Sequence, residues 1–132
     1  MRKLITTSFS LFLSIAVSCA AGFLSLSVPV SAHHSGAMFD MAHPVTVTGT
    51  VTKVEWMNPH AYMYLSVKDD KGALQDWAIE MNSPNFLKHN GWTSTTISAG
   101  DKIICTGAPA RNGSRVMHAT MVQLPNGLQL RS

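Results

Sequence analysis

The run of residues 45–56 alternates valine and threonine, and this pattern constrains the fold more than any other part of the sequence. β-Branched side chains at this density favour a strand, and their alternation gives the strand one apolar and one polar face. The apolar parity changes before Val54, which predicts one extra residue, a β-bulge, within the strand. Gly49 allows the strand to coil tightly nearby. We therefore expect a long, bent first strand.

Turn and cap signals divide the rest of the chain into short elements. Ser83 followed by Pro84 is typical of a helix start, and Gly91 is typical of the left-handed residue just past a helix end. In such an ending Trp92 folds back on Leu87 and plugs one end of a sheet. The expected strands span residues 45–56, 61–67, 74–81, 102–108 and 115–124.

These elements predict a mainly β protein: a small five-stranded OB-like Greek-key barrel with one short helix between strands 3 and 4. An open β-sandwich of similar strand content is the alternative, because the order of strands along a chain does not fix their pairing. The tail, residues 125–132, is expected to be a loose end.

The N-terminal segment has the features of an export signal. Arg2 and Lys3 precede an uncharged, mostly apolar run, residues 4–30. The small residues Val30 and Ala32 fit the positions that a signal peptidase recognises, so cleavage after Ala32 is expected. An uncleaved membrane anchor is one alternative, since the run is long enough to span a bilayer.

Cleavage would leave a single domain, residues 33–132, in the periplasm or outside the cell, with residues 1–32 as the signal peptide. Lipidation at Cys19 is a further alternative. Cys105 would be the only remaining cysteine, so no internal disulfide could form. Its apolar neighbours indicate a buried hydrophobic residue.

The charge pattern argues against two classes of partner. The chain carries 10 Lys and Arg against 7 Asp and Glu, and two of the cations, Arg2 and Lys3, would leave with the signal. The remaining cations are scattered along the sequence, whereas a nucleic-acid groove needs them clustered. Binding to nucleic acid, or to a membrane after cleavage, is not expected.

Histidines supply the strongest functional hypothesis. Cleavage after Ala32 would place His33 at the terminus, where its imidazole and α-amino group can chelate one metal ion. A further imidazole would complete a nitrogen-rich copper site of the histidine-brace kind. The alternative is that His33 and His34 are polar residues on a flexible arm. The candidate metal ligands are His33, His34, His60 and His118.

Two of these histidines belong to ordered parts of the predicted fold. His60 ends a corner between the first two strands, which Pro59 stiffens. His118 is expected on the semi-buried face of the fifth strand together with Val122, and Met117 on the opposite face. The chain has 8 methionines. Thioether combined with imidazole is a soft ligand set suited to Cu(I), although most methionines are expected in the core.

The leading hypothesis is therefore a periplasmic metal-binding protein rather than an enzyme, and the nitrogen-rich donor set favours copper as its metal. The least favoured of three hypotheses is a redox enzyme that uses the same copper. The second hypothesis is a binding module that stacks a small organic, sugar or peptide ligand on an aromatic barrel face. The residues available to it are Trp56, Asn58, Tyr62, Tyr64, Trp77 and Glu80. Glu80 lacks a partner carboxylate, so a solvated residue or an anchor for a histidine is expected there.

Several short blocks of the sequence are similar to one family of small exported proteobacterial proteins, a domain of unknown function. Its pattern includes a His-His-Ser start of the mature chain and a Trp-x-Asn-Pro-His motif. The resemblance implies no activity or cofactor, but it implies that these blocks belong to a shared pattern. They are Ala32-His33-His34-Ser35 with Met38-Phe39-Asp40, Val47-Thr48-Gly49-Thr50-Val51, Trp56 with Asn58-Pro59-His60, Ser83-Pro84-Asn85 with Gly91-Trp92, and Gly100-Asp101 with Gly107 and Pro109.

Overall fold

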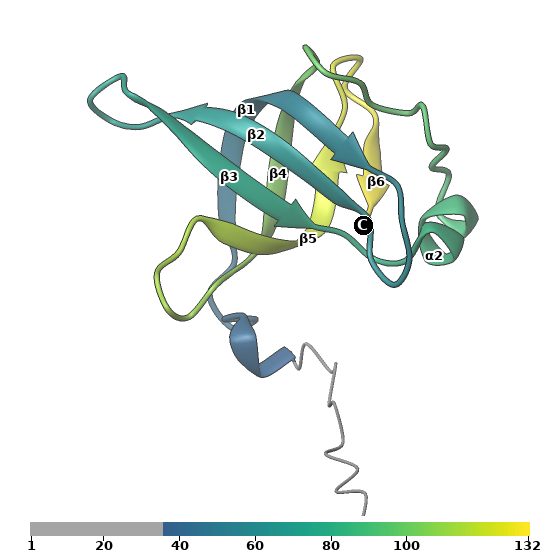
Figure 1. The fold of residues 1–132 in the computed structure, drawn as a ribbon, viewed down its shortest axis with the longest axis horizontal. Coiled ribbons are helices and arrows are strands. Elements are labelled where there is room, and N and C mark those ends of the chain that lie inside the picture. The colour runs from purple at the N-terminus through teal and green to yellow at the C-terminus, as the bar shows by residue number, and fades with distance from the viewer. Residues whose placement is uncertain (1–35) are drawn as a thin grey trace, which may run out of the picture. The chain divides into compact units, whose positions relative to one another are not determined.

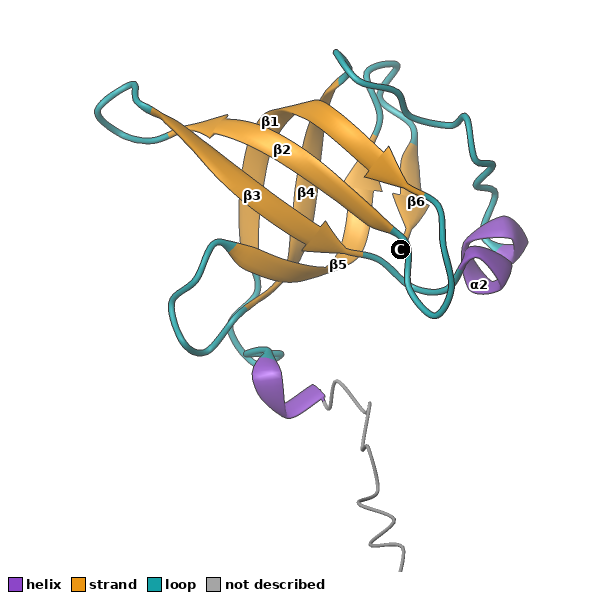
Figure 2. Ribbon diagram, in the orientation of Figure 1, coloured by secondary structure: helices purple, strands orange, loops and turns teal. Residues whose placement is uncertain are grey.

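The computed structural model describes residues 36–132 (Figure 1), so the predicted signal peptide lies outside the described residues. Figure 2 shows that strands are the main regular structure of this part, accompanied by one short α-helix and several long loops. Within it, no helix is long and apolar enough to cross a membrane. The elements are η1 (Gly36–Met38), β1 (Val45–Glu55), β2 (Tyr62–Lys68), β3 (Leu74–Glu80), α2 (Pro84–His89), β4 (Lys102–Pro109), β5 (Val116–Gln123) and β6 (Gln129–Arg131).

The strands form a closed barrel. They pair in the order β3-β2-β1-β4-β5-β6, and an additional pairing of β3 with β5 closes the sheet. The closing pair is parallel and joins residues 78–80 to residues 116–118, whereas the other pairs are antiparallel. This connectivity, with α2 between β3 and β4, confirms the predicted OB-like barrel and excludes the open sandwich.

The first strand bends where the sequence predicted. Its register against β2 shifts between Val51 and Lys53, which leaves Thr52 as the extra residue of a β-bulge. Gly49 pairs with both β2 and β4. A Cβ at this position would lie 2.9 Å from the carbonyl oxygen of Ser66, so only glycine lets β2 approach so closely.

The helix ends as predicted and closes one end of the barrel. The Trp92 amide donates to the carbonyl of Leu87 (3.0 Å), and the Gly91 amide donates to that of Lys88 (3.3 Å), the two bonds of a Schellman ending. Leu87 and Trp92 are both buried in the core. Ser83 caps the other end, where its side-chain oxygen accepts from a backbone amide.

The expectation of a loose tail was wrong. Residues 129–131 form β6, which pairs with β5, and the indole of Trp92 donates a 2.7 Å hydrogen bond to the carbonyl of Arg131. Leu130 packs against the core. The apolar contact and the buried indole donor give the tail a fixed position, because an unpaired indole N–H inside the protein would be costly.

Cys105 is a buried core residue, as predicted. Its side chain is fully buried, and Sγ lies 3.6 Å from Sδ of Met117. Burial raises the pKa of the Cys105 thiol to about 12, so the thiol stays protonated at neutral pH.

The face of β5 that carries His118 differs from the prediction. The pairing of β4 with β5 shifts at Thr106 and Gly107, so Thr120 becomes an extra residue in β5. The shift changes which side chains point inward. Before the extra residue the odd-numbered Met117 is buried, and after it the even-numbered Val122 is buried. His118 therefore lies on the outer face of the barrel, opposite to Met117 and not on the face of Val122.

Gly107 permits this irregular pairing, and its substitution should destabilise the fold. A Cβ added at Gly107 would lie 2.2 Å from the carbonyl oxygen of His118 and 2.8 Å from Cα of Ala119. Because both atoms belong to the backbone, β5 would have to move. We expect Gly107→Ala to lower the free energy of unfolding by about 2 to 3 kcal/mol in urea titrations.

Gly72→Ala is the matched control. Gly72 has a positive φ of 81°, but a Cβ there would meet no atom within 4 Å. That variant should lose about 1 kcal/mol through backbone strain alone. A loss for Gly107→Ala no larger than this would contradict the proposed steric clash.

Candidate functional site

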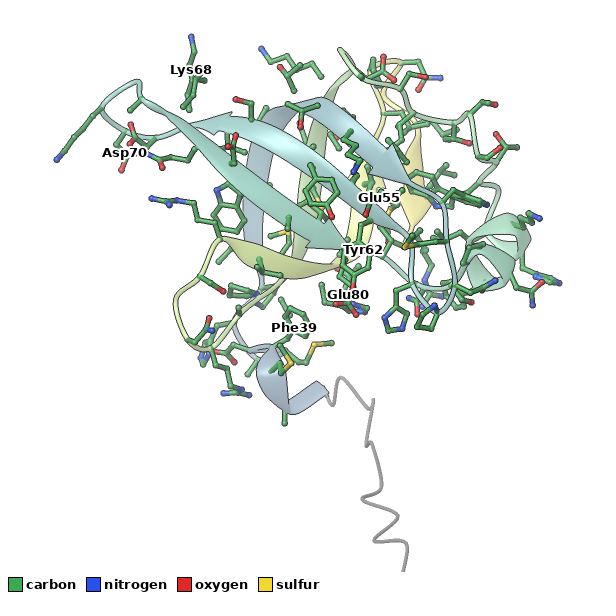
Figure 3. All side chains as sticks on the ribbon, in the orientation of Figure 1. Phe39, Glu55, Tyr62, Lys68, Asp70 and Glu80 are labelled. Atoms are coloured by element: carbon green, nitrogen blue, oxygen red, sulfur yellow. The ribbon has the colours of Figure 1, made fainter. Side chains whose placement is uncertain are left out.

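Strand register brings four polar residues together on the outer face of the barrel. Tyr62 on β2 is paired with Glu80 on β3, and Glu80 is paired with His118 on β5. His60 precedes Tyr62 by two residues and contacts the same carboxylate. Figure 3 shows Tyr62 and Glu80 side by side near the end of β3. We call His60, Tyr62, Glu80 and His118 the outer-face cluster.

Glu80 is the centre of this cluster. Its carboxylate accepts a 3.1 Å hydrogen bond from the hydroxyl of Tyr62 and lies 2.7 Å from Nδ1 of His60. Glu80 is only 5% exposed, although it points away from the core. A buried carboxylate is costly without partners, so these contacts stabilise its position. The prediction of an anchor for a histidine matches this arrangement, whereas a solvated side chain does not.

The contact between His60 and Glu80 is close but poorly directed. Although the distance is 2.7 Å, the carboxylate oxygen lies off the direction in which the ring N–H would donate, so Nδ1 has no well-aligned hydrogen-bond partner among the described residues. The attraction is therefore mainly electrostatic in this ring orientation. The buried side of the imidazole faces Glu80, and the ring as a whole remains 29% exposed.

Tyr62 stays a hydrogen-bond donor at any ordinary pH. Burial, reinforced by the negative charge of Glu80, raises the pKa of Tyr62 to about 12. Its hydroxyl therefore keeps its proton and supports the carboxylate.

His118 is covered by an aromatic ring from the N-terminal segment. The ring centroids of Phe39 and His118 are 5.7 Å apart, and Phe39 is 4% exposed. Burial lowers the pKa of His118, an effect that the charge of Glu80 opposes and that of His60 reinforces. The imidazole of His118 is therefore held in its neutral form, which is the form that binds metal ions.

Backbone hydrogen bonds fix the segment that carries Phe39. Phe39 forms an isolated antiparallel bridge with Ala110. On either side of it, the carbonyl of Met38 accepts from the amide of Arg111 (2.9 Å), and the amide of Asp40 donates to the carbonyl of Pro109 (2.8 Å). The segment thus continues the sheet beyond the end of β4 and holds Phe39 against His118.

The other predicted ligands lie upstream of this anchor. His33 and His34 lie outside the described residues. His33 is six positions before Phe39 in the sequence, so the two Cα atoms can be at most about 22 Å apart.

The described residues alone supply an incomplete metal site. Within residues 36–132, no group of three or more His, Cys, Asp or Glu side chains is arranged so that it could hold a metal ion. His60 and His118 both contribute to the outer-face cluster, but a metal ion bound there would need additional donors.

The aromatic residues predicted to bind an organic ligand do not share one face. Trp56 and Trp77 are partly buried and pack against the hydrophobic core. Tyr62 and Tyr64 are two residues apart on β2, so both point outward from the barrel. Asn58 is exposed in the corner, where the Asn58–Pro59 peptide is cis.

A second polar network on the outer face was not predicted from the sequence. The hydroxyl of Tyr64 donates to Glu55 (3.0 Å), which also pairs with Lys53. A surface hollow of about 530 Å³ lies beside it and is lined by Thr52, Lys53, Tyr64 and Asp76. The alternation of Lys53 and Glu55 along β1 is the sequence signal that could have indicated this network, because residues two apart in a strand share a face.

Removing Phe39 should raise the pKa of His118 in the metal-free protein. Burial is the main cause of the lowered pKa of His118, and Phe39 covers the ring. In Phe39→Ala, NMR titration of the imidazole should therefore give a pKa closer to the ordinary value of 6.5. Leu128→Ala, which also removes a large apolar side chain but on the β5–β6 turn, is the control and should leave the titration of His118 unchanged.

The same shift predicts a pH dependence of stability. Because the pKa of His118 is lower in the folded protein than the unfolded value near 6.5, the unfolded chain binds a proton more readily. The contribution to stability is present above pH 6.5 and is lost as the pH falls through the folded pKa. Urea titrations over about two pH units, from about pH 7.5 to about pH 5.5, should show a shallower decline in the free energy of unfolding for His118→Gln than for the native protein. Equal declines would contradict the assignment.

Comparison with known proteins supports the family resemblance. No curated protein matches the chain. A family model matches residues 20–119, a range that contains His33 and His34, the corner before β2 and the whole outer-face cluster. The chain belongs to DUF6152, a family of unknown function.

Proposed function

We propose that this protein is exported and binds a metal ion, with copper preferred, through the processed N-terminus together with His60 and His118. The observation that carries the proposal is the packing of Phe39 on His118. This contact anchors the chain six residues after His33 directly at an imidazole of the outer-face cluster. The terminal donors therefore need only a short arm to reach the site.

The donor set suits copper. Cleavage after Ala32 would give His33 a free α-amino group next to its imidazole, and the two close a chelate within one residue. His60 and His118 supply imidazole nitrogens from ordered parts of the barrel. Nitrogen-rich sites of this kind favour Cu(II), because nitrogen donors bind it more tightly than the other first-row divalent metal ions.

Glu80 would serve the site by orienting a ligand. A carboxylate beside Nδ1 of a histidine favours the tautomer in which Nε2 is free to bind a metal ion. The 2.7 Å contact between Glu80 and Nδ1 of His60 supports that role.

The stacking alternative has less support. It requires a continuous aromatic face, but Trp56 and Trp77 pack against the core and leave Tyr62 and Tyr64 as the outward-facing aromatic residues of that set. In the hollow beside Tyr64, the other lining residues are Thr52, Lys53 and Asp76, none of which is aromatic.

A copper titration of the processed protein tests the proposal. We expect one Cu(II) ion to bind, with nitrogen ligands visible by electron paramagnetic resonance. Adding one Ala before His33, or substituting His60→Ala, should weaken binding by about tenfold or more, that is by at least about 1.4 kcal/mol. Affinity should also fall as the solution is acidified, because protons compete for the imidazoles and the amine.

His89→Ala is the matched control. His89 is an exposed residue at the end of α2, where its Nδ1 lies 2.7 Å from the carbonyl oxygen of Asn85. Its loss should leave the affinity for Cu(II) unchanged. Equal affinities in the native, extended and His60→Ala proteins would refute the terminal site, and so would the absence of binding in all of them.

A further inference from the structure

Three methionine side chains are unusually exposed, and all three belong to the segments that flank the outer-face cluster. Met38 is 48% exposed, Met41 is 55% exposed and Met57 is 51% exposed. By contrast, Met63, Met81 and Met117 are fully buried in the core. Three described methionines thus form a core group and three a surface group, while Met121 is partly buried and belongs to neither.

The surface group lies close to the cluster along the chain. Met38 and Met41 flank the anchor that places Phe39 on His118. Met57 precedes His60 by three residues, which limits the separation of their Cα atoms to about 11 Å. Each thioether therefore extends from a backbone position next to an imidazole of the cluster or next to the ring that covers one.

Exposure of these side chains gives up the benefit of burying them. A fully buried methionine gains about 1.5 to 3 kcal/mol over an exposed one. Leu74 and Leu128 are 64% and 53% exposed, so exposure alone marks no site, and the three methionines are distinguished by their sulfur and their place beside the cluster. Thioethers are neutral, soft donors that prefer soft cations such as Cu(I). The carboxylate of Asp40 lies 3.8 Å from the guanidinium of Arg111, so it offsets the positive charge beside Met38.

We propose that Met38, Met41 and Met57, together with an imidazole of the cluster, bind Cu(I). This inference rests on the proposed function only in placing copper at the cluster, because the thioether site needs no free N-terminus. The two oxidation states would use different donors: Cu(II) the amine and imidazole nitrogens, and Cu(I) the thioethers with an imidazole. One surface would thereby hold copper in both states.

Silver(I) is a suitable probe, because it has the soft character of Cu(I) and is neither oxidised nor reduced during a titration. We would titrate the processed protein with Ag(I) against a competing chelator and follow the methionine methyl groups by carbon-13 NMR. The test variant is M38L/M41L/M57L. Leucine keeps the apolar volume but removes the sulfur, and all three positions are exposed, so the fold should persist.

The triple variant should bind Ag(I) at least about tenfold more weakly than the native protein, with its affinity for Cu(II) unchanged. In the native protein, the methyl signals of the three surface methionines should shift on adding Ag(I), while those of the buried methionines stay in place. Met121→Leu is the control. Met121 lies on β5 next to β6 and is partly buried, so its loss should leave both affinities unchanged.

The outcomes separate this inference from the proposed function. Equal Ag(I) affinity in the native and triple-variant proteins would overturn the thioether site, whatever Cu(II) does. So would a loss of Ag(I) binding in Met121→Leu as large as in the triple variant. If Cu(II) fails to bind the native protein but Ag(I) binding still depends on the three methionines, the thioether site stands and the terminal chelate does not.

Discussion

The parallel pairing of β3 with β5 is the contact on which the rest of the structure depends. It converts an open sheet into a barrel, and it involves the last residues of β3 and the first residues of β5. Without it, Glu80 and His118 would lie on opposite edges of the sheet. The same hydrogen-bonded register that closes the core therefore assembles the outer-face cluster, so the stability of the fold and the geometry of the cluster are linked.

The cluster also shows how a charged group can be kept on the outside of a barrel and yet be buried. Glu80 projects from the outer face, but the neighbouring side chains of Tyr62 and His60 contact its carboxylate. Phe39 adds an apolar cover over His118 next to it. Removing water from such a group strengthens its electrostatic interactions, because the surrounding dielectric constant is lower. A few side chains and one short segment thus create a polar environment unlike the surrounding surface.

Much of the fold could be predicted from the sequence because its local signals agree with one another. The alternation in β1, the bulge that becomes Thr52 and the cap residues around α2 are all short-range features. The strand pairing was inferred from the overall layout, and the structure confirms it. The tail was missed because β6 is short and is held by a distant indole, Trp92, whose partner no local pattern reveals.

The candidate site was harder to predict for the same reason. His60 could be recognised from its corner, but the face of His118 depends on an extra residue in β5, and a bulge there leaves no clear mark in the sequence. Glu80 and His118 are neighbours only because β3 pairs with β5. The burial of Glu80 requires side chains from three strands or loops. Contacts between residues far apart in the sequence depend on the three-dimensional fold. The alternation of inward and outward side chains along one strand does not.

The position of Cys105 has a consequence for how long a metal ion would remain on this surface. Thiolates hold soft cations far more tightly than thioethers do, and they release them slowly. Cys105, the only cysteine among the described residues, is enclosed in the core with its proton retained. At the proposed metal site a cation would therefore meet imidazole, thioether and carboxylate donors, which exchange more readily than a thiolate. Binding of that kind would be reversible loading and release rather than permanent capture.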